Sequence, residues 1–237
     1  MNNLKSCALL IIAMIILVSC DKVEQTTQYK STVPIYEKMA NIRLMATSVV
    51  APQEINKKGK IYIFKQYLFI NEPQKGIHIY DNANPANPKA VSFINILGNV
   101  DMAIKDDVLY ADNYVDLLSF DLSNPERPVL ISRNEDVFKS VYAYNYPSLN
   151  LTDVIVGYKD TVYTYTHSST RNPYIKDEKV YFEQNNLGAY GQGGSMARFT
   201  LAKEHLYTVD DKSLNLFDVS NKNTPIFLKN IPLGWGI

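Results

Sequence analysis

The sequence predicts an all-β protein, and three observations lead to that fold class. One pattern of aromatic, aspartate, asparagine and proline residues recurs at fixed offsets. Within one 40-residue period of that pattern, four short apolar segments are separated by turn residues. Apolar residues make up 46% of the 237-residue chain and glycine occurs only 10 times, so the chain can form a packed core and is neither disordered nor collagen-like.

The N-terminal residues predict export. The run from Cys7 to Val18 carries no charge, and its twelve residues are too short to span a bilayer but suit a secretory signal. The run ends in Leu-Val-Ser-Cys at positions 17–20, which resembles the lipobox of bacterial lipoproteins. The resemblance implies that Cys20 receives the lipid and becomes the first residue of the mature chain. The alternative is an ordinary signal peptide that is followed by an incidental cysteine.

Residues 1–19 are therefore predicted to be a lipoprotein signal peptide, and residues 20–38 a flexible tether. The tether is mostly polar and has no helical or alternating apolar period. Asp21 directly after Cys20 signals inner-membrane retention in some bacteria with two membranes but not in all of them. We expect a location in the cell envelope at the outer membrane, and the face of that membrane stays open.

Three segments of the chain align without gaps around the aspartates Asp81, Asp121 and Asp218. In each segment an aromatic residue precedes the aspartate, an asparagine follows three residues later and a proline seven residues later. A leucine and an aromatic residue also lie side by side upstream of each aspartate. Agreement at several fixed offsets indicates an internal repeat.

The spacing of the repeat predicts a β-propeller-like array of four-stranded blades. Asp81 and Asp121 are 40 residues apart, and strands are expected there at 100–104, 108–111, 117–121 and 129–132. Asp121 and Asp218 are 97 residues apart. This longer interval predicts a degenerate blade that ends near 154–158 and an insertion near 161–194. About 200 residues beyond the tether supply roughly four to five blades, and we expect an open arc, that is, an incomplete ring.

The LVIVD repeat, a β-propeller-type unit of exported bacterial and archaeal proteins, is similar to three segments of this chain: GIHIYDNANPANP, LLSFDLSNPERP and LNLFDVSNKNTP. The resemblance implies that residues 39–237 form a propeller-type domain in a cell-surface lipoprotein. It implies no general chemistry.

No catalytic residue, cofactor or metal site is predicted. The three repeated aspartates are expected to cap turns by accepting backbone N–H groups, because one carboxylate per blade is too few for the six or more oxygens that calcium prefers. His78, His167 and His205 lie far apart and lack the paired spacing of a zinc site. The chain also has no GxSxG motif of the kind that carries a nucleophilic serine.

The insertion is rich in tyrosine and is the predicted binding surface. Its tyrosines are Tyr163, Tyr165, Tyr174, Tyr181 and Tyr190. One interpretation is that these rings pack between blades. The other is that they are exposed and contact a partner, because tyrosine brings a large contact area at a low entropic cost.

We therefore expect a lipid-anchored module that binds a protein or glycan partner. Lysine plus arginine and aspartate plus glutamate both number 24, which excludes the basic excess of a nucleic-acid binder. The alternatives are a glycan-directed envelope enzyme with its acids at the propeller mouth, and a scaffold. Two carboxylates about 5–10 Å apart in a central depression, with a perturbed pKa, would favour the enzyme.

Overall fold

The structure is a computed structural model, and antiparallel β-strands dominate the part of the chain that it describes. The described residues are 24–45, 47–138, 153–168, 198–209 and 213–233, without the side chains of 24, 25 and 165–168. The chain divides into two compact units, one of residues 1–33 with 158–189 and the other of residues 34–157 with 190–237.

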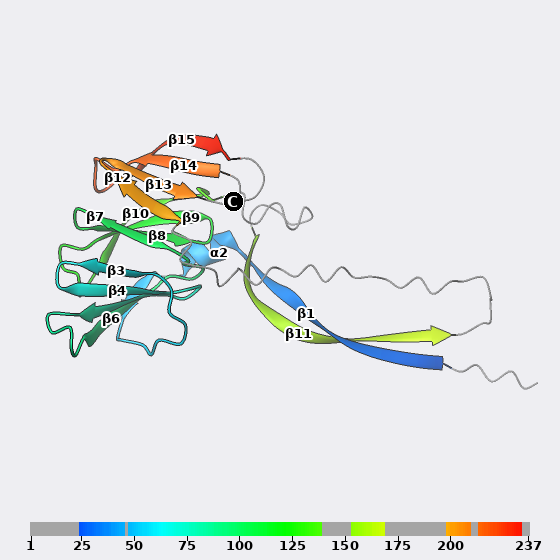
Figure 1. Ribbon diagram of the computed structural model, residues 1–237. Coiled ribbons are helices and arrows are strands. Elements are labelled where there is room, and N and C mark those ends of the chain that lie inside the picture. Colours follow the sequence, from blue (N-terminus) through cyan, green and yellow to red (C-terminus); the bar gives the residue numbers. More distant parts are fainter. Residues whose placement is uncertain (1–23, 46, 139–152, 169–197, 210–212, 234–237) are drawn as a thin grey trace, which may run out of the picture. The chain divides into compact units, whose positions relative to one another are not determined.

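The larger unit contains three antiparallel sheets (Figure 1). The first sheet has the strand order β2 (Ser48–Val50), β6 (Lys89–Asn95), β5 (Gly76–Asp81), β4 (Tyr67–Glu72) and β3 (Ile61–Phe64). The second has the order β10 (Val129–Asn134), β9 (Asp116–Asp121), β8 (Val108–Asn113) and β7 (Met102–Lys105). The third has the order β12 (Phe199–Ala202), β13 (His205–Val209), β14 (Ser213–Asp218) and β15 (Ile226–Pro232).

The all-β class is confirmed, and the four strands expected in the second sheet are present within two residues of their expected bounds. Each sheet contains four strands that follow one another along the chain and pair with their sequence neighbours. The first sheet gains a fifth strand because β2 pairs with β6. None of these sheets closes into a ring within the described residues.

The second sheet packs between the other two, because its strands alternate apolar residues between their two faces. Its strand β7 lies beside β3 on one side and beside β12 on the other. Ile104, Leu109 and Phe120 share one face and pack against residues of the first sheet such as Phe69 and Ile77. The opposite face packs against the third sheet through a second cluster of side chains. Its members are Ala103, Val108, Tyr110 and Leu117 of the second sheet with Phe199, Leu206 and Phe217 of the third.

Asp101, just before β7, connects all three sheets. Its carboxylate forms an ion pair with Lys60 of the first sheet, at 2.9 Å, and accepts the backbone N–H of Phe199 of the third, also at 2.9 Å. Asp112, at the end of β8, accepts the side-chain amide of Asn99 at 2.8 Å and the backbone N–H of Asp101 at 2.9 Å. The contacts of Asp101 fix how the three sheets meet beside β7, whereas Asp112 holds the segment before β7 in place within the second sheet.

The short helix α2 (Met39–Leu44) packs on the turn between β8 and β9. Its buried residues Met39 and Ile42 contact Tyr114 and Val115 of that turn. Arg43, on the same helix, binds the buried carboxylate of Asp116 through two hydrogen bonds of 2.9 and 2.7 Å. The helix is too short to be stable by itself, so these contacts are what hold it in place.

Two expectations for the segments around the sheets are wrong. Residues 24–38, expected to belong to a flexible tether, form strand β1 (Glu24–Lys38). Residues 154–158, expected to end a degenerate blade, belong to strand β11 (Asp153–Ser168), whose one partner among the described strands is β1. The two strands run antiparallel (Figure 1), as the contacts Tyr29–Tyr163 and Thr32–Asp160 also indicate. Local sequence does not reveal this pairing, because the two strands are more than a hundred residues apart in the chain.

No helix among the described residues is long and apolar enough to cross a membrane.

Candidate functional site

The repeated aspartates occupy equivalent turns in the three sheets. Asp81, Asp121 and Asp218 each end the third strand of their sheet. Each carboxylate accepts the backbone N–H two residues further on, at 2.9, 2.9 and 2.8 Å respectively. The asparagine three residues later repeats this geometry with the backbone N–H two residues after itself. This is the turn structure that the repeat predicts, and it explains the recurrence of both residues by local hydrogen bonding.

Most of the other predicted positions lie outside the described residues. This applies to Cys20 and to Tyr174, Tyr181 and Tyr190, and the side chain of Tyr165 is not described. Tyr163 is 40% exposed on β11 and stacks on Tyr29 of β1 with a ring-centroid distance of 5.6 Å. The structure therefore describes the surroundings of one of the five tyrosines.

Two buried acids lie close together near the start of β7, but their carboxylates are already bound by groups of the protein. Burial raises the pKa of Asp112 to about 6, which is the kind of perturbation that an active site can show. The carboxylate of Asp112, however, is bound by Asn99 and Asp101, and that of Asp101 is bound by Lys60 and Phe199. No group of three or more His, Cys, Asp or Glu side chains in the described ranges is placed to hold a metal ion. These acids therefore have a structural role in the geometry observed.

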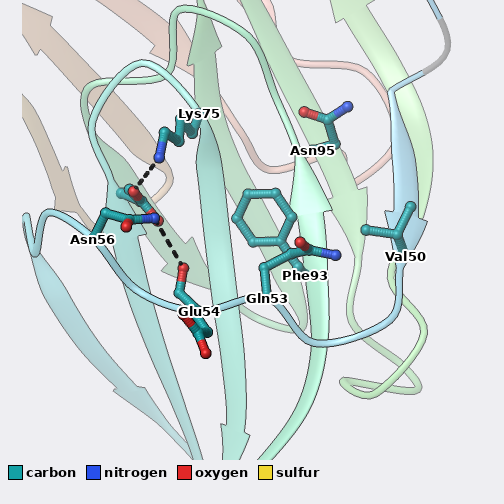
Figure 2. Close-up of a pocket in the computed structure, with 8 residues that line it drawn as sticks. Val50, Gln53, Glu54, Asn56, Lys75, Phe93 and Asn95 are labelled. Atoms are coloured by element: carbon teal, nitrogen blue, oxygen red, sulfur yellow. Dashed lines mark hydrogen bonds and ion pairs between the residues drawn. The ribbon is translucent and has the colours of Figure 1, made fainter.

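A hollow of about 300 Å³ on the first sheet is the best candidate for a binding site. It lies on the face of this sheet that is turned away from the second sheet, because Phe93 and Asn95 point opposite to Ile94, which belongs to the core. We call it the first-sheet pocket. It is lined by Val50, Gln53, Glu54, Asn56, Glu72, Lys75, Phe93 and Asn95 (Figure 2).

Strand register explains why these residues meet. Val50 pairs with Phe93, and Phe93 pairs with His78, so the three side chains form a row across neighbouring strands. One step further along, Glu72 pairs with Gly76 and Gly76 pairs with Asn95. The turn between β4 and β5 supplies Lys75, and the segment of residues 51–60, which connects β2 to β3, supplies the remaining lining.

A buried ion cluster forms one wall of the pocket. Glu72 is almost fully buried, and its two carboxylate oxygens contact Lys75 Nζ at 2.7 Å and His78 Nε2 at 2.8 Å. Burial by itself would raise the pKa of Glu72, but the hydrogen bonds from Lys75 and His78 outweigh it and bring this pKa to about 2. The carboxylate is therefore ionised and accepts from both partners. On the opposite side His78 packs against Phe93 with a ring-centroid distance of 4.5 Å.

Other polar groups of the pocket are not used by the fold. Within the described part of the chain, the carboxylate of Glu54 and the side-chain amide of Asn95 have no hydrogen-bond or ion-pair partner. Lys75 makes one ion pair, which leaves two of its N–H groups for another acceptor. Phe93 lies between these groups in Figure 2, with Glu54 and Lys75 to its left and Asn95 to its upper right. The site therefore offers donors, acceptors and one aromatic ring to a small ligand.

Little in the sequence indicates this site. Its residues come from four separate segments, and their proximity depends on the pairing of β2 with β6 and of β4 with β5. The one available signal is a charged or polar residue inside an apolar strand, as with His78 between two isoleucines. Such a residue requires a buried partner, and here the partner is Glu72.

Comparisons with known proteins identify no family. No protein-family model matches the chain, and no curated protein matches it. Among solved structures, the chain is similar to the N-terminal domain of Nup159, with 11% identity and a TM-score of 0.37, over 76% of this chain and 32% of that chain. A complex of S. cerevisiae Dbp5 bound to Nup159, Gle1, IP6 and ADP shows 10% identity and a TM-score of 0.35, with the same coverage of 76% and 32%. This chain therefore spans about a third, 32%, of the length of each of these two chains.

Proposed function

We propose that this protein is a lipid-anchored binding module of the cell envelope, built of β-propeller blades of the LVIVD-repeat kind. Its first-sheet pocket receives part of a protein or glycan partner. The observation that carries the proposal is the contrast between two sets of polar groups. The buried acids Asp101, Asp112 and Asp116 are all engaged in joining the fold, whereas Glu54 and Asn95 face a hollow with no partner in the described residues.

The repeated turns support the propeller part of the proposal. Three antiparallel sheets follow one another and pack face to face, and each contains four consecutive strands with the same turn between the third and the fourth. Their inner strands β3, β7 and β12 are neighbours, which is the arrangement of adjacent blades around an axis. The described residues contain three such sheets, so the proposal of four to five blades requires further strands in the remaining chain.

The lipid anchor is tested by fractionation. Wild-type protein and Cys20→Ala protein are expressed in a bacterium that processes lipoproteins, and membrane and soluble fractions are compared by immunoblot. We expect the wild type in the membrane fraction and the Cys20→Ala protein in the soluble fraction. An equal membrane content of the two proteins would contradict the anchor.

The binding role is tested by capture from envelope extracts. The full chain and the double variant Glu54→Gln/Asn95→Ala are immobilised, and bound material is compared after equal washing. The control is Asn87→Ala, because Asn87 is exposed in the turn between β5 and β6 and does not line the pocket. We expect material that the wild type and the control retain and the double variant loses. If all three proteins capture the same material, the pocket is not the binding site.

The tyrosine-rich insertion is the competing surface, and the same assay addresses it. Tyr163→Ala removes the one ring of this set whose position is known and leaves the pocket intact. If this variant alone loses capture, the binding site lies on the insertion and not at the pocket.

A further inference from the structure

We propose that the first-sheet pocket binds an uncharged saccharide unit, that is, a hexose or N-acetylhexosamine residue of a glycan. This inference rests on the proposed binding function and specifies its ligand. Three properties of the lining lead to it: its charge, its small apolar content and the distribution of its donors and acceptors.

Charge disfavours an anionic ligand. The pocket contains the carboxylates of Glu54 and Glu72 and the ammonium group of Lys75. Glu72 and Lys75 neutralise each other at 2.7 Å, so the charge that remains facing the hollow is the negative charge of Glu54. A phosphate, a sulfate or a uronic acid would meet this carboxylate without an unpaired cation to balance it.

A metal cation and an apolar ligand fit the lining poorly as well. The single unpaired carboxylate of Glu54 cannot supply the six to eight oxygens that calcium takes. Only Val50 and Phe93 contribute apolar side chains, and Phe93 is 7% exposed, so a lipid chain would find little surface to cover.

The polar groups match the rim of a sugar ring. Glu54 accepts only, Lys75 donates only, and Asn95 does both, whereas each sugar hydroxyl can donate one hydrogen bond and accept others. One ring thus satisfies all three side chains at once. The part of Phe93 that lines the hollow is small, since this side chain is 7% exposed, and it would contact C–H groups at one edge of the sugar ring. A volume of about 300 Å³ lies at the lower limit for ligand pockets and suits one unit of a glycan.

The test uses defined sugars and the purified full chain. Glucose, galactose, mannose and N-acetylglucosamine are each titrated, and binding is followed by saturation-transfer NMR with competition between the sugars. We expect at least one sugar to bind saturably with a Kd on the order of 1 mM, as is typical of a few hydrogen bonds around a small ligand. Asn95→Ala and Glu54→Gln should each weaken this binding about fivefold or more, and Asn87→Ala should leave it unchanged. Circular dichroism melts of every variant verify that it is folded.

Two results would overturn the saccharide assignment. One is that no sugar of the panel binds, and the other is that binding is equal in the pocket variants and in Asn87→Ala. The extract capture described above separates this failure from failure of the binding role. Periodate cleaves the vicinal diols of sugars. If pocket-dependent capture survives periodate treatment of the extract but is lost after protease treatment, the pocket is a binding site and its partner is a protein. If capture does not depend on the pocket residues, both the pocket as binding site and the saccharide assignment are wrong.

Discussion

Removal of the Asp116 carboxylate should destabilise the larger unit strongly. Asp116 is completely buried, and four hydrogen bonds end on it. Two come from Arg43, at 2.9 and 2.7 Å, one from Arg133 at 2.7 Å, and one from the backbone N–H of Asp136 at 3.0 Å. Burial raises the pKa of Asp116, but the hydrogen bonds from Arg43, Asp136 and Arg133 more than compensate, so the net pKa is lowered and the carboxylate is charged.

The expected cost of Asp116→Ala follows from what its partners lose. Breaking a buried ion pair costs about 3–5 kcal/mol when the remaining charge stays unpaired. Here the side chains of Arg43 and Arg133 are 22% and 16% exposed, and Arg43 keeps Glu135 and Asp136 as partners. The lower end of the range applies, at about 3 kcal/mol. For a chain of this size that free energy lowers Tm by roughly 6–12 °C.

Urea unfolding followed by circular dichroism measures this cost, and a double-mutant cycle with Arg43→Ala isolates the pair. We expect a coupling free energy of about 1–2 kcal/mol between Asp116 and Arg43. Asp136→Asn is the matched control, because it removes a carboxylate that also contacts Arg43, at 3.0 Å, but is 49% exposed, and asparagine tolerates the φ of 55° at this position. This change should cost less than about 1 kcal/mol. A cost below about 1 kcal/mol for Asp116→Ala, or additive effects in the cycle, would refute the reasoning.

Three further predictions concern single buried positions. Burial raises the pKa of Asp112 from its ordinary value of 3.8 to about 6, so the folded chain holds this proton more tightly than the unfolded chain. The free energy of unfolding should therefore rise by up to about 3 kcal/mol as the pH falls from about 7 to about 4. Asp112→Asn should remove this rise in urea titrations. The hydroxyl of Thr208 is buried without a hydrogen-bond partner among the described residues, so Thr208→Val should leave Tm unchanged or raise it. Gly76 has a φ of +147°, and an added Cβ would lie 2.0 Å from the backbone oxygen of Ile94. Gly76→Ala should therefore lower the free energy of unfolding by at least about 3 kcal/mol. At Gly157 the nearest atom to an added Cβ is 3.9 Å away, so Gly157→Ala should change it by less than about 1 kcal/mol in the same urea assay.

Features that depend on neighbouring residues could be predicted from the sequence. The turns at Asp81, Asp121 and Asp218 are built from hydrogen bonds to residues two positions away, so the pattern of residue types contains all the information that they need. Alternating apolar residues and short turns likewise place the four strands of the second sheet, because antiparallel strands that follow one another pair with their sequence neighbours.

Features that depend on distant residues were decided only by the tertiary structure. The segments 24–38 and 153–168 each have the composition of a possible strand, but nothing local specifies that they pair with each other rather than with a blade. The same holds for the first-sheet pocket, where the short strand β2 must join β6 before Val50 can meet Phe93. Asp101 is one more acid in the sequence, and its role in joining the sheets follows from the approach of Lys60 and Phe199. Local hydrogen bonding determined the turns, whereas long-range packing determined which surfaces meet and which polar groups remain available to a ligand.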